Sequence, residues 1–220
     1  MPATTTFTTR AVLLDMDGTL VDSEASVARC WRRWAAEQGL DAEAVLAVVH
    51  GRQAHVSMAE LLPGRPTERN LADSRRLLEW ESTDTEGVVP IPGAPALLAA
   101  LADHPHALVT SAAQPLAEAR MGAAGLPMPP VRVTAEQVGA SKPDPEAFLK
   151  GAAALGFSPG DCVAFEDSAA GVAAGLAAGM PVVGVGPRAA SLSPTAHVRD
   201  LEQVTVEPLP DGRLRLHVSA

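Results

Sequence analysis

The chain has 220 residues and a formal net charge of −9, with 47% hydrophobic and 20% charged residues. This length suits one large domain or a core domain with a smaller insertion, and the apolar content is enough for a substantial hydrophobic core. The acidic balance, without any block rich in Lys and Arg, argues against nucleic acid or an anionic lipid surface as partner.

Cys30 and Cys162 lie far apart, and neither belongs to a metal-binding spacing. We therefore expect two reduced, buried thiols in a cytoplasmic protein. The first ten residues contain no apolar segment of the kind found in a signal peptide. No membrane partner is expected from this part of the chain.

The segment 10–15 (RAVLLD) predicts a short apolar strand. From Glu24 onward the apolar residues recur with helical spacing, and four helices are predicted: 24–40, 41–51, 56–64 and 67–82. Asp41 is suited to cap the second helix, and Thr67 with Asn70 forms an incomplete capping box at the fourth. No strand is predicted between 24 and 86, so we expect an all-helical insertion there.

Strands and helices alternate after residue 87. The expected strands are 106–110, 131–134, 162–167 and 181–186, and the expected helices are 94–103, 114–125, 144–156 and 169–179. This alternation predicts an α/β fold: a Rossmann-like parallel sheet with helices on both faces. We expect residues 1–22 and 87–220 to form this core domain, with 23–86 as a helical bundle inserted after the first strand.

Two segments of the core have further signals. Between Ser168 and Gly186, small residues recur as Gly171, Gly175 and Gly179, which predicts a helix packed closely against the sheet. Pro181 interrupts this apolar run, which lacks the roughly 20 continuous apolar residues of a membrane span. Near the end, 204–219 reads as two alternating strands around Asp211-Gly212, a hairpin signal.

Polar residues cluster where the predicted strands end. In open parallel α/β sheets, sites lie outside the carboxyl ends of the strands. The residues at these ends and in the loop before the helix at 144 are Asp15, Asp17, Thr110, Ser111, Lys142, Glu166 and Asp167. Each alone has an ordinary explanation, such as capping the next turn. Together they predict a Mg²⁺ site made of carboxylates and a backbone carbonyl, with Lys142 as further positive charge. A carboxylate beside Mg²⁺ is an arrangement typical of an aspartyl-phosphate intermediate.

From about 11 to 186 the chain resembles the haloacid dehalogenase superfamily, specifically its phosphatases with a helical cap. The resemblance implies that Asp15 is the nucleophile and that Asp17 is the acid and base that serves the leaving oxygen and then water. It also implies that Thr110, with Ser111 beside it, contacts the phosphoryl group and that Lys142 holds Asp15 and the phosphoryl oxygens. The implied metal ligands are Asp15, the Asp17 carbonyl and Asp167, with Glu166 as a direct ligand or an outer partner.

Two branches of the superfamily do not fit the chain. The dehalogenases lack an acid at the position of Asp17, because a halide leaves without a proton. Phosphonate hydrolases also lack it and use a lysine of the cap, whereas 24–86 contains no Lys. The resemblance therefore favours a phosphatase.

The segment 48–57 (VVHGRQAHVS) resembles the cap of sugar-phosphate phosphatases, and 84–94 with 123–138 resembles the bacterial hexitol phosphatases. The expected activity is Mg²⁺-dependent hydrolysis of a small phosphorylated sugar or sugar alcohol by a monomer. Arg52 is a candidate ligand for a phosphate or for sugar oxygens, and His50 for hydroxyl groups. A solvated arginine and a local histidine hydrogen bond are the alternatives.

Two other functions remain open. A phosphosugar mutase of the β-phosphoglucomutase type shares the fold and motifs, but in those mutases a histidine lies twelve residues after the nucleophile, where this chain has Val27. A binding protein on an inactive scaffold would lack some motif residue, and none is missing here. Trp31 and Trp34 are expected in the core of the helical insertion. The identity of the sugar is not readable from the sequence.

Overall fold

The computed structural model describes residues 4–219. Residues 1–3 and 220, which the expected core ranges 1–22 and 87–220 include, lie outside the described residues. Within 4–219 the central sheet has six parallel strands in the order β6-β5-β2-β7-β8-β9. These strands are β2 (Ala11–Leu14), β5 (His106–Val109), β6 (Val131–Val133), β7 (Cys162–Glu166), β8 (Val182–Val185) and β9 (Ala196–Val198). The expected parallel sheet is confirmed, while the short strand β9 was not anticipated.

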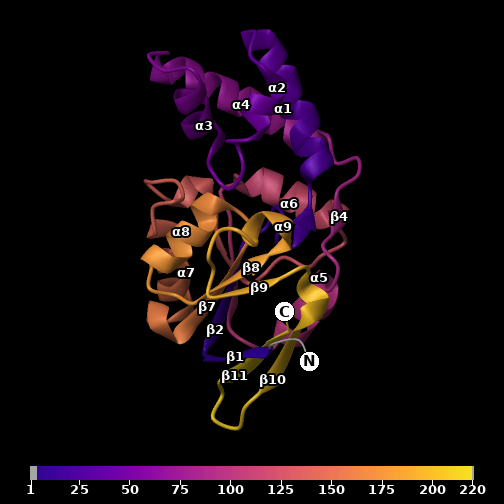
Figure 1. The fold of residues 1–220 in the computed structure, drawn as a ribbon, viewed down its shortest axis with the longest axis vertical. Coiled ribbons are helices and arrows are strands. Elements are labelled where there is room, and N and C mark those ends of the chain that lie inside the picture. The colour runs from indigo at the N-terminus through magenta and orange to yellow at the C-terminus, as the bar shows by residue number, and fades with distance from the viewer. Residues whose placement is uncertain (1–3, 220) are drawn as a thin grey trace.

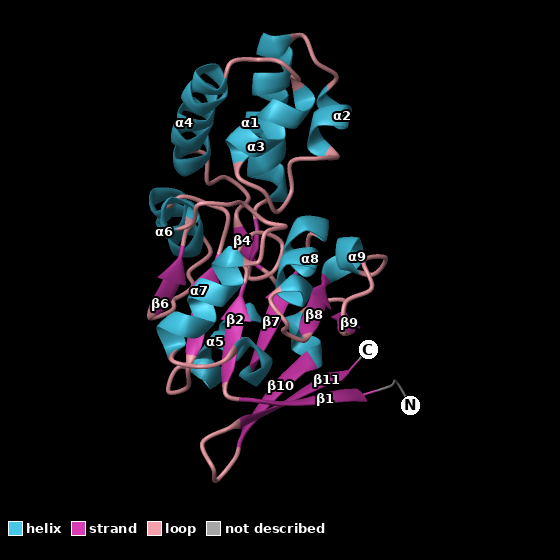
Figure 2. Cartoon of the chain, turned by 90° about the vertical axis from the view of Figure 1, so that its left-hand side faces the viewer, coloured by secondary structure: helices cyan, strands magenta, loops and turns pink. Residues whose placement is uncertain are grey.

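Helices cover both faces of this sheet, as expected for the fold (Figure 2). Side chains of β2 alternate between the faces, because successive residues of a strand point to opposite sides. Val12 and Leu14 pack in the cluster that contains α5 and α6, whereas Ala11 and Leu13 pack with α7 and α8. The four helices are α5 (Ala94–Leu101), α6 (Gln114–Ala123), α7 (Glu146–Leu155) and α8 (Ala169–Ala177).

Helix α8 lies close to the sheet, as its glycines predict. A Cβ atom at Gly175 would come within 2.8 Å of Val182 Cγ2 in β8. Such a distance is far inside van der Waals contact, so a larger residue here would push the helix away from the sheet. The helix ends before Gly179, which has a positive φ of 81° and closes the turn towards β8.

A second sheet lies at the end of the core that is opposite to the helices of the insertion, which are called the helical layer below (Figures 1 and 2). Its antiparallel order is β1-β11-β10, with β1 (Thr4–Thr9), β10 (Val204–Pro208) and β11 (Leu214–Ser219). The predicted hairpin at 204–219 is thereby confirmed. Strand β1, a run rich in threonine without apolar alternation, was missed, because its order comes from pairing with β11.

Helices α1–α4 form a separate layer beyond the carboxyl ends of the central strands (Figure 1). They are α1 (Glu24–Gln38), α2 (Ala42–Leu46), α3 (Ala54–Leu61) and α4 (Thr67–Thr83). The layer has its own apolar cluster, in which Trp34 is fully buried and Trp31 is 4% exposed. Their rings meet edge to face, with centroids 5.5 Å apart. Both tryptophans therefore belong to the core of this layer, as expected.

Helices α2 and α3 have other bounds than the sequence predicted, and α3 covers Ala54–Leu61 instead of 56–64. Helix α2 ends at Leu46 instead of near Gly51; the branched Val48 and Val49 that follow have a lower helix propensity. Asp41 caps α2 by accepting a hydrogen bond from Ala44 N, as predicted. Helix α4 already includes Thr67, so no capping box forms, and Pro66 precedes it without a side-chain cap.

The chain enters and leaves the helical layer side by side. Strand β3 (Val21–Asp22) pairs antiparallel with β4 (Val89–Pro90). These two connections place the helical layer directly above the edge of the sheet where the candidate residues lie.

The remaining short elements lie in the core. The helix α9 (Gly186–Ala189) follows β8, and single 3₁₀ turns cover Ala135–Gln137, Pro159–Asp161 and Leu201–Gln203.

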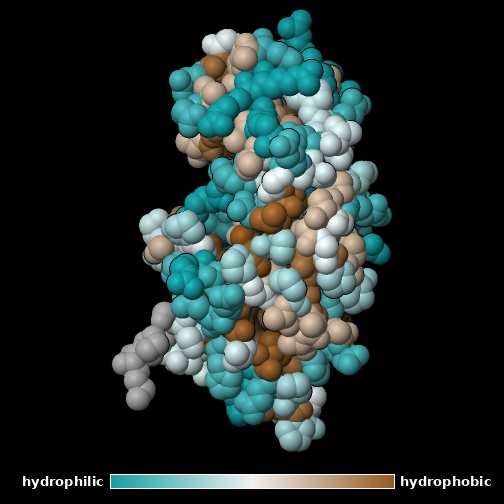
Figure 3. All heavy atoms as spheres, turned by 90° about the vertical axis from the view of Figure 1, so that its right-hand side faces the viewer, coloured by the Kyte–Doolittle hydropathy of each residue, from teal (hydrophilic) through white to brown (hydrophobic). Residues whose placement is uncertain are grey.

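On the face shown in Figure 3, the helical layer at the top is largely hydrophilic, whereas apolar residues gather over the sheet-containing part below. Among residues 4–219, no helix is both long enough and apolar enough to cross a membrane. Cys30 and Cys162 are free and buried, as expected, and burial raises the pKa of each thiol to about 11.

Candidate active site

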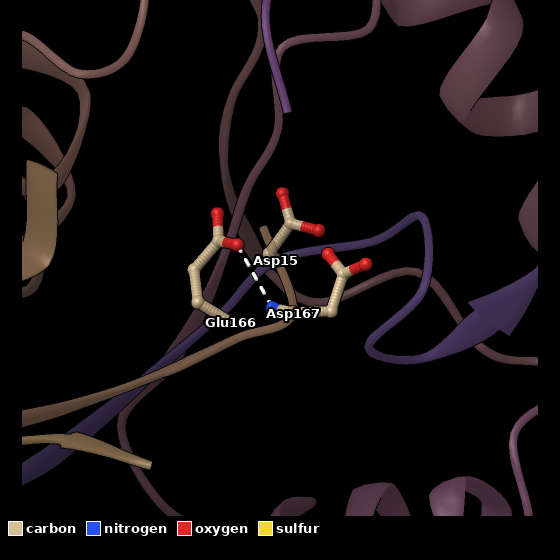
Figure 4. A group of neighbouring side chains, drawn as sticks. All are labelled: Asp15, Glu166 and Asp167. Atoms are coloured by element: carbon tan, nitrogen blue, oxygen red, sulfur yellow. Dashed lines mark hydrogen bonds between the residues drawn. The ribbon is translucent and has the colours of Figure 1, made fainter. Parts of the chain in front are cut away.

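Three carboxylates from two neighbouring strands meet at the carboxyl edge of the central sheet. Asp15 follows β2, Glu166 ends β7, and Asp167 follows it. All three are buried, and one oxygen of each lies within 4.8 Å of the others. Figure 4 shows their side chains directed into one space. The cluster forms because β2 and β7 are adjacent and parallel, with Leu14 opposite Phe165.

Lys142 supplies a buried positive charge to this cluster. Its Nζ donates to Asp15 Oδ1 at 2.7 Å, to Glu166 Oε1 at 2.6 Å and to the Val109 carbonyl at 3.0 Å. An ammonium has three donors, so all of them are used. The two carboxylates raise the pKa of Lys142 against the effect of burial, so the side chain stays charged and holds Asp15 in place.

Both oxygens of Glu166 are engaged within the chain. Oε1 accepts from Lys142, and Oε2 accepts from the main-chain N–H groups of Asp167 and Ser168 and from the Ser168 hydroxyl. A Cβ at Gly171 would lie 1.8 Å from Oε1, so only glycine leaves room for this carboxylate. Among the positions expected to bind metal, Glu166 therefore suits an outer position that orients Lys142.

The remaining charge at the cluster fits a divalent cation. Burial and the neighbouring Glu166 carboxylate raise the pKa of Asp15 well above its ordinary value. Burial and Glu166 also raise the pKa of Asp167 to about 7, although Arg188 acts in the opposite direction. Carboxylates whose ionised forms are disfavoured in this way gain stabilisation from added positive charge. Oxygen ligands of this kind suit Mg²⁺.

Asp17 lies at the start of the turn that leads from β2 to β3. Its Oδ1 accepts from the Ser23 hydroxyl at 2.6 Å, and its Oδ2 accepts from Arg120 Nη1 at 2.8 Å. Gly18 has a φ of 85°, a conformation that favours glycine. A Cβ there would also lie 2.1 Å from Asp167 Oδ2, so the glycine lets the two acidic segments approach.

Two basic residues of the site were not anticipated from the sequence. Arg120 of α6 is 3% exposed and lies between Asp17 and Glu81 of α4. Arg188 of α9 donates to Asp167 Oδ2 at 2.7 Å and also pairs with Glu24, the first residue of α1. Neither lies in a recognisable motif, and their role depends on which helices the fold places beside the sheet.

A cavity of about 160 Å³ lies between the helical layer and the carboxylates. Asp15, Asp17 and Thr110 line it from the sheet side, and His50 and Arg52 from the loop between α2 and α3. These five sequence-predicted residues, three from the core and two from the helical insertion, thus face the same space. Lys142, Glu166 and Asp167 lie beside or beneath it and are not among its lining residues.

Several of the predicted substrate-binding groups also make contacts within the chain. Thr110 Oγ1 accepts from Ala112 N at 3.0 Å, which leaves its hydroxyl proton available to donate. The Ser111 hydroxyl donates to the Gly51 carbonyl at 3.0 Å and so joins the core to the helical layer. Ser111 therefore has a partner that the sequence did not suggest.

The two candidates from the helical layer are also paired. Arg52 forms an ion pair with Glu60 of α3. His50 Nε2 lies 3.7 Å from Glu24 Oε1, and burial together with Arg188 lowers the pKa of its ring. Both residues line the cavity, but neither ion-pair partner, Glu60 or Glu24, belongs to the carboxylate cluster.

Comparison with known proteins agrees with this fold. The model of the haloacid dehalogenase-like hydrolase family matches residues 9–179. Hexitol phosphatase A of Escherichia coli is 46% identical over 92% of this chain and 96% of its own. Glycerol-1-phosphate phosphohydrolase 1 of Saccharomyces cerevisiae is 33% identical over 84% of this chain and 79% of its own. The crystal structure of a hydrolase from Pseudomonas syringae superposes with a TM-score of 0.77 at 20% identity, covering 87% of this chain and 94% of that one.

A parallel α/β core with buried carboxylates at its carboxyl edge defines a protein of the Rossmann-like α/β class. The family match extends over most of the chain, and the chain therefore belongs to the haloacid dehalogenase-like hydrolases. The resemblance inferred from Asp15, Lys142 and Asp167 is confirmed at the level of the family, and the two relatives are named as phosphatases.

Proposed function

We propose that the protein is a Mg²⁺-dependent phosphatase that hydrolyses small phosphorylated sugars or sugar alcohols through an aspartyl phosphate on Asp15. The observation that carries the proposal is the position of Asp15: a buried carboxylate, fixed by Lys142 through one oxygen, that lines a cavity together with Asp17. The names of the relatives support the class of substrate.

In the first half-reaction, an oxygen of Asp15 attacks the phosphorus atom. The bond from phosphorus to the sugar oxygen breaks, and that oxygen takes a proton from Asp17. The Thr110 hydroxyl follows β5, the neighbour of β2, and lines the same cavity as Asp15, so it is placed to hold a phosphoryl oxygen. Lys142 holds Asp15, and a contact of its ammonium with the phosphoryl group would replace one of its three present hydrogen bonds. In the second half-reaction, water attacks the phosphorus and gives a proton to Asp17. The bond between phosphorus and the Asp15 oxygen breaks, so that inorganic phosphate is released and the Asp15 carboxylate is restored.

Asp15, Asp167 and the main-chain carbonyl of Asp17 are the groups that would hold Mg²⁺. When bound, Mg²⁺ supplies positive charge against the phosphoryl oxygens and the clustered carboxylates. Glu166 supports these ligands through Lys142, in line with its engaged oxygens. The Arg188 guanidinium orients Asp167 through Oδ2, and no hydrogen bond within residues 4–219 occupies Oδ1.

The helical layer of residues 23–86 would act as a cap that closes over the cavity and selects the substrate. Its loop between α2 and α3 already contacts the core: Gln53 N donates to Ser141 Oγ at 2.9 Å. Closure excludes water and completes a site. Within this cap, His50 and Arg52 are the candidate contacts to the sugar, as expected from the sequence.

The test is phosphate release from a set of phosphorylated sugars, polyols, nucleotides and small acids, with Mg²⁺ and with excess chelator. Release should require Mg²⁺ and should nearly disappear in the Asp15→Asn variant, because an amide is a poor nucleophile. Activity that persists in that variant or in the chelator would refute the mechanism.

A mutase of the same fold is distinguished by its product. Val27, which lines the cavity, cannot exchange a proton or donate a hydrogen bond, so water should compete freely for the phosphoryl group. With β-glucose 1-phosphate and a trace of the 1,6-bisphosphate, inorganic phosphate should dominate. Mainly glucose 6-phosphate with little free phosphate would instead identify a mutase.

A further inference from the structure

The ion pair between Glu81 and Arg120 is buried beside the reacting groups and has no part in the mechanism above. Glu81 is 7% exposed and Arg120 is 3% exposed. Glu81 belongs to α4 of the helical layer and Arg120 to α6 of the core, so the pair spans the boundary between them. Buried ion pairs add little net stability compared with apolar residues of similar volume. The burial of this pair beside the reacting groups therefore points to a role other than stability.

Both residues line the cavity that Asp15 and Asp17 line. Arg120 Nη1 donates to Asp17, whereas Nε and Nη2 have no hydrogen-bond partner within residues 4–219. The distance from Nη2 to Glu81 Oε1 is 3.3 Å, longer than a strong charge-assisted hydrogen bond of about 2.7–2.9 Å. The cavity therefore offers unsatisfied donors next to a weakly paired carboxylate.

The charge of this place favours a neutral polar ligand. One guanidinium faces two carboxyl groups, those of Asp17 and Glu81, which already offset its charge, so a second phosphate or a carboxylate would gain little there. A hydroxyl group suits it, because a hydroxyl can accept from a guanidinium and donate to a carboxylate at the same time. Apolar side chains of Val27, Trp31 and Leu78 line the same cavity and suit a carbon chain.

The position of Asp17 indicates which hydroxyl would lie there. In the proposed reaction Asp17 serves the ester oxygen of the substrate, and Arg120 contacts Asp17 directly. We propose that Arg120 and Glu81 form a subsite for the hydroxyl on the carbon next to the phosphate-bearing carbon. The subsite rests on the proposed phosphatase function and narrows its substrates to phosphate esters of vicinal diols, such as polyol and sugar phosphates.

The test compares two phosphate esters that differ by this hydroxyl alone: glycerol 1-phosphate and propane-1,3-diol 1-phosphate. Groups built to bind a hydroxyl are left unpaired by an analogue that lacks it. The wild type should therefore prefer glycerol 1-phosphate by about 10- to 100-fold in kcat/KM. A wild type that releases phosphate from both esters at similar kcat/KM would overturn the subsite.

The decisive variant replaces Arg120 by Met and Glu81 by Leu together, which removes both charges and leaves neither one buried alone. Turnover should fall for both esters, because Asp17 loses a partner. The ratio of kcat/KM for glycerol 1-phosphate to kcat/KM for propane-1,3-diol 1-phosphate should fall to within about 3-fold. A purely structural role would leave this ratio unchanged. Glu81→Gln is the milder variant: its neutral acceptor should lower the preference several-fold, and an unchanged preference in it would also count against the subsite.

Arg65→Met is the matched control. Arg65 is a partly buried arginine of the helical layer that pairs with Asp73 at 2.7 Å and does not line the cavity. It should keep the wild-type ratio between the two esters. If the wild type released no phosphate from any sugar or polyol phosphate with Mg²⁺, the proposed function would fail. Activity without preference for the vicinal hydroxyl would refute the subsite alone.

Discussion

Replacing Glu81 by Gln should change how the free energy of unfolding depends on pH. Burial raises the pKa of Glu81 from 4.5 to about 7, although Arg120 acts in the opposite direction. A carboxyl with a raised pKa in the folded state holds its proton more tightly when folded than when unfolded. Its contribution to stability is therefore complete below the unfolded pKa and is lost as the pH rises to the folded pKa.

The size of the effect follows from the two pKa values. One pKa unit corresponds to about 1.36 kcal/mol, so the rise from 4.5 to about 7 corresponds to about 3 kcal/mol over the whole range. Between about pH 5.5 and 7 the wild type should lose about 2 kcal/mol from this residue. Glutamine does not titrate, so the stability of Glu81→Gln relative to the wild type should rise by that amount.

Urea denaturation of both proteins at about pH 5.5 and about pH 8 measures this difference. A chelator is present at both pH values, so that bound metal does not contribute to the stability of either protein. Glu79→Gln is the control, because Glu79 is exposed on the same helix; its stability relative to the wild type should change by no more than about 0.5 kcal/mol. If the difference between the wild type and Glu81→Gln were the same at both pH values, the burial argument would be wrong.

Three further predictions concern catalysis. Asp17→Asn should slow phosphoenzyme formation more for a sugar phosphate than for p-nitrophenyl phosphate, since only the sugar oxygen needs a proton; equal losses in rapid-quench measurements would argue against acid catalysis. Arg52→Ala should cost about 1–3 kcal/mol in kcat/KM for the best sugar phosphate and much less for p-nitrophenyl phosphate; equal costs would mean a structural role. Gly51→Ala should lower kcat/KM, because a Cβ there would lie 2.0 Å from Ser168 Oγ of the core. Gly64→Ala is the control: Gly64 also has a positive φ, as Gly51 does, but a Cβ there would have no atom within 4 Å. This variant should keep the wild-type kcat/KM.

The residues of the strand ends were readable from the sequence because the chemistry of each lies within a short segment. The hydrophobic pattern predicts one buried strand just before Asp15 and Asp17 and another that ends at Glu166 and Asp167. It therefore places these four acidic residues at strand ends. Parallel strands then bring their carboxyl ends to one edge. The helices of the insertion were also predictable, since their apolar spacing is local.

Strand β1 and the boundary of α2 were not predictable in the same way. The threonine-rich β1 has no apolar alternation, and its conformation depends on pairing with β11 more than 200 residues later. Helix α2 stops at Leu46 although the pattern continues. In both places the spacing of apolar residues did not indicate the element, and its extent depends on the tertiary environment.

The sequence by itself determined the family, the nucleophile candidate and the acidic cluster, because these depend on short motifs at the ends of strands. Only the tertiary structure decided that Arg120 and Glu81, which lie on two helices and are 39 residues apart in sequence, meet beside Asp17. It also decided that both oxygens of Glu166 are engaged within the chain. A helical arginine looks the same in sequence whether it faces water or a cavity, because its partners come from elements whose placement depends on packing of the whole chain.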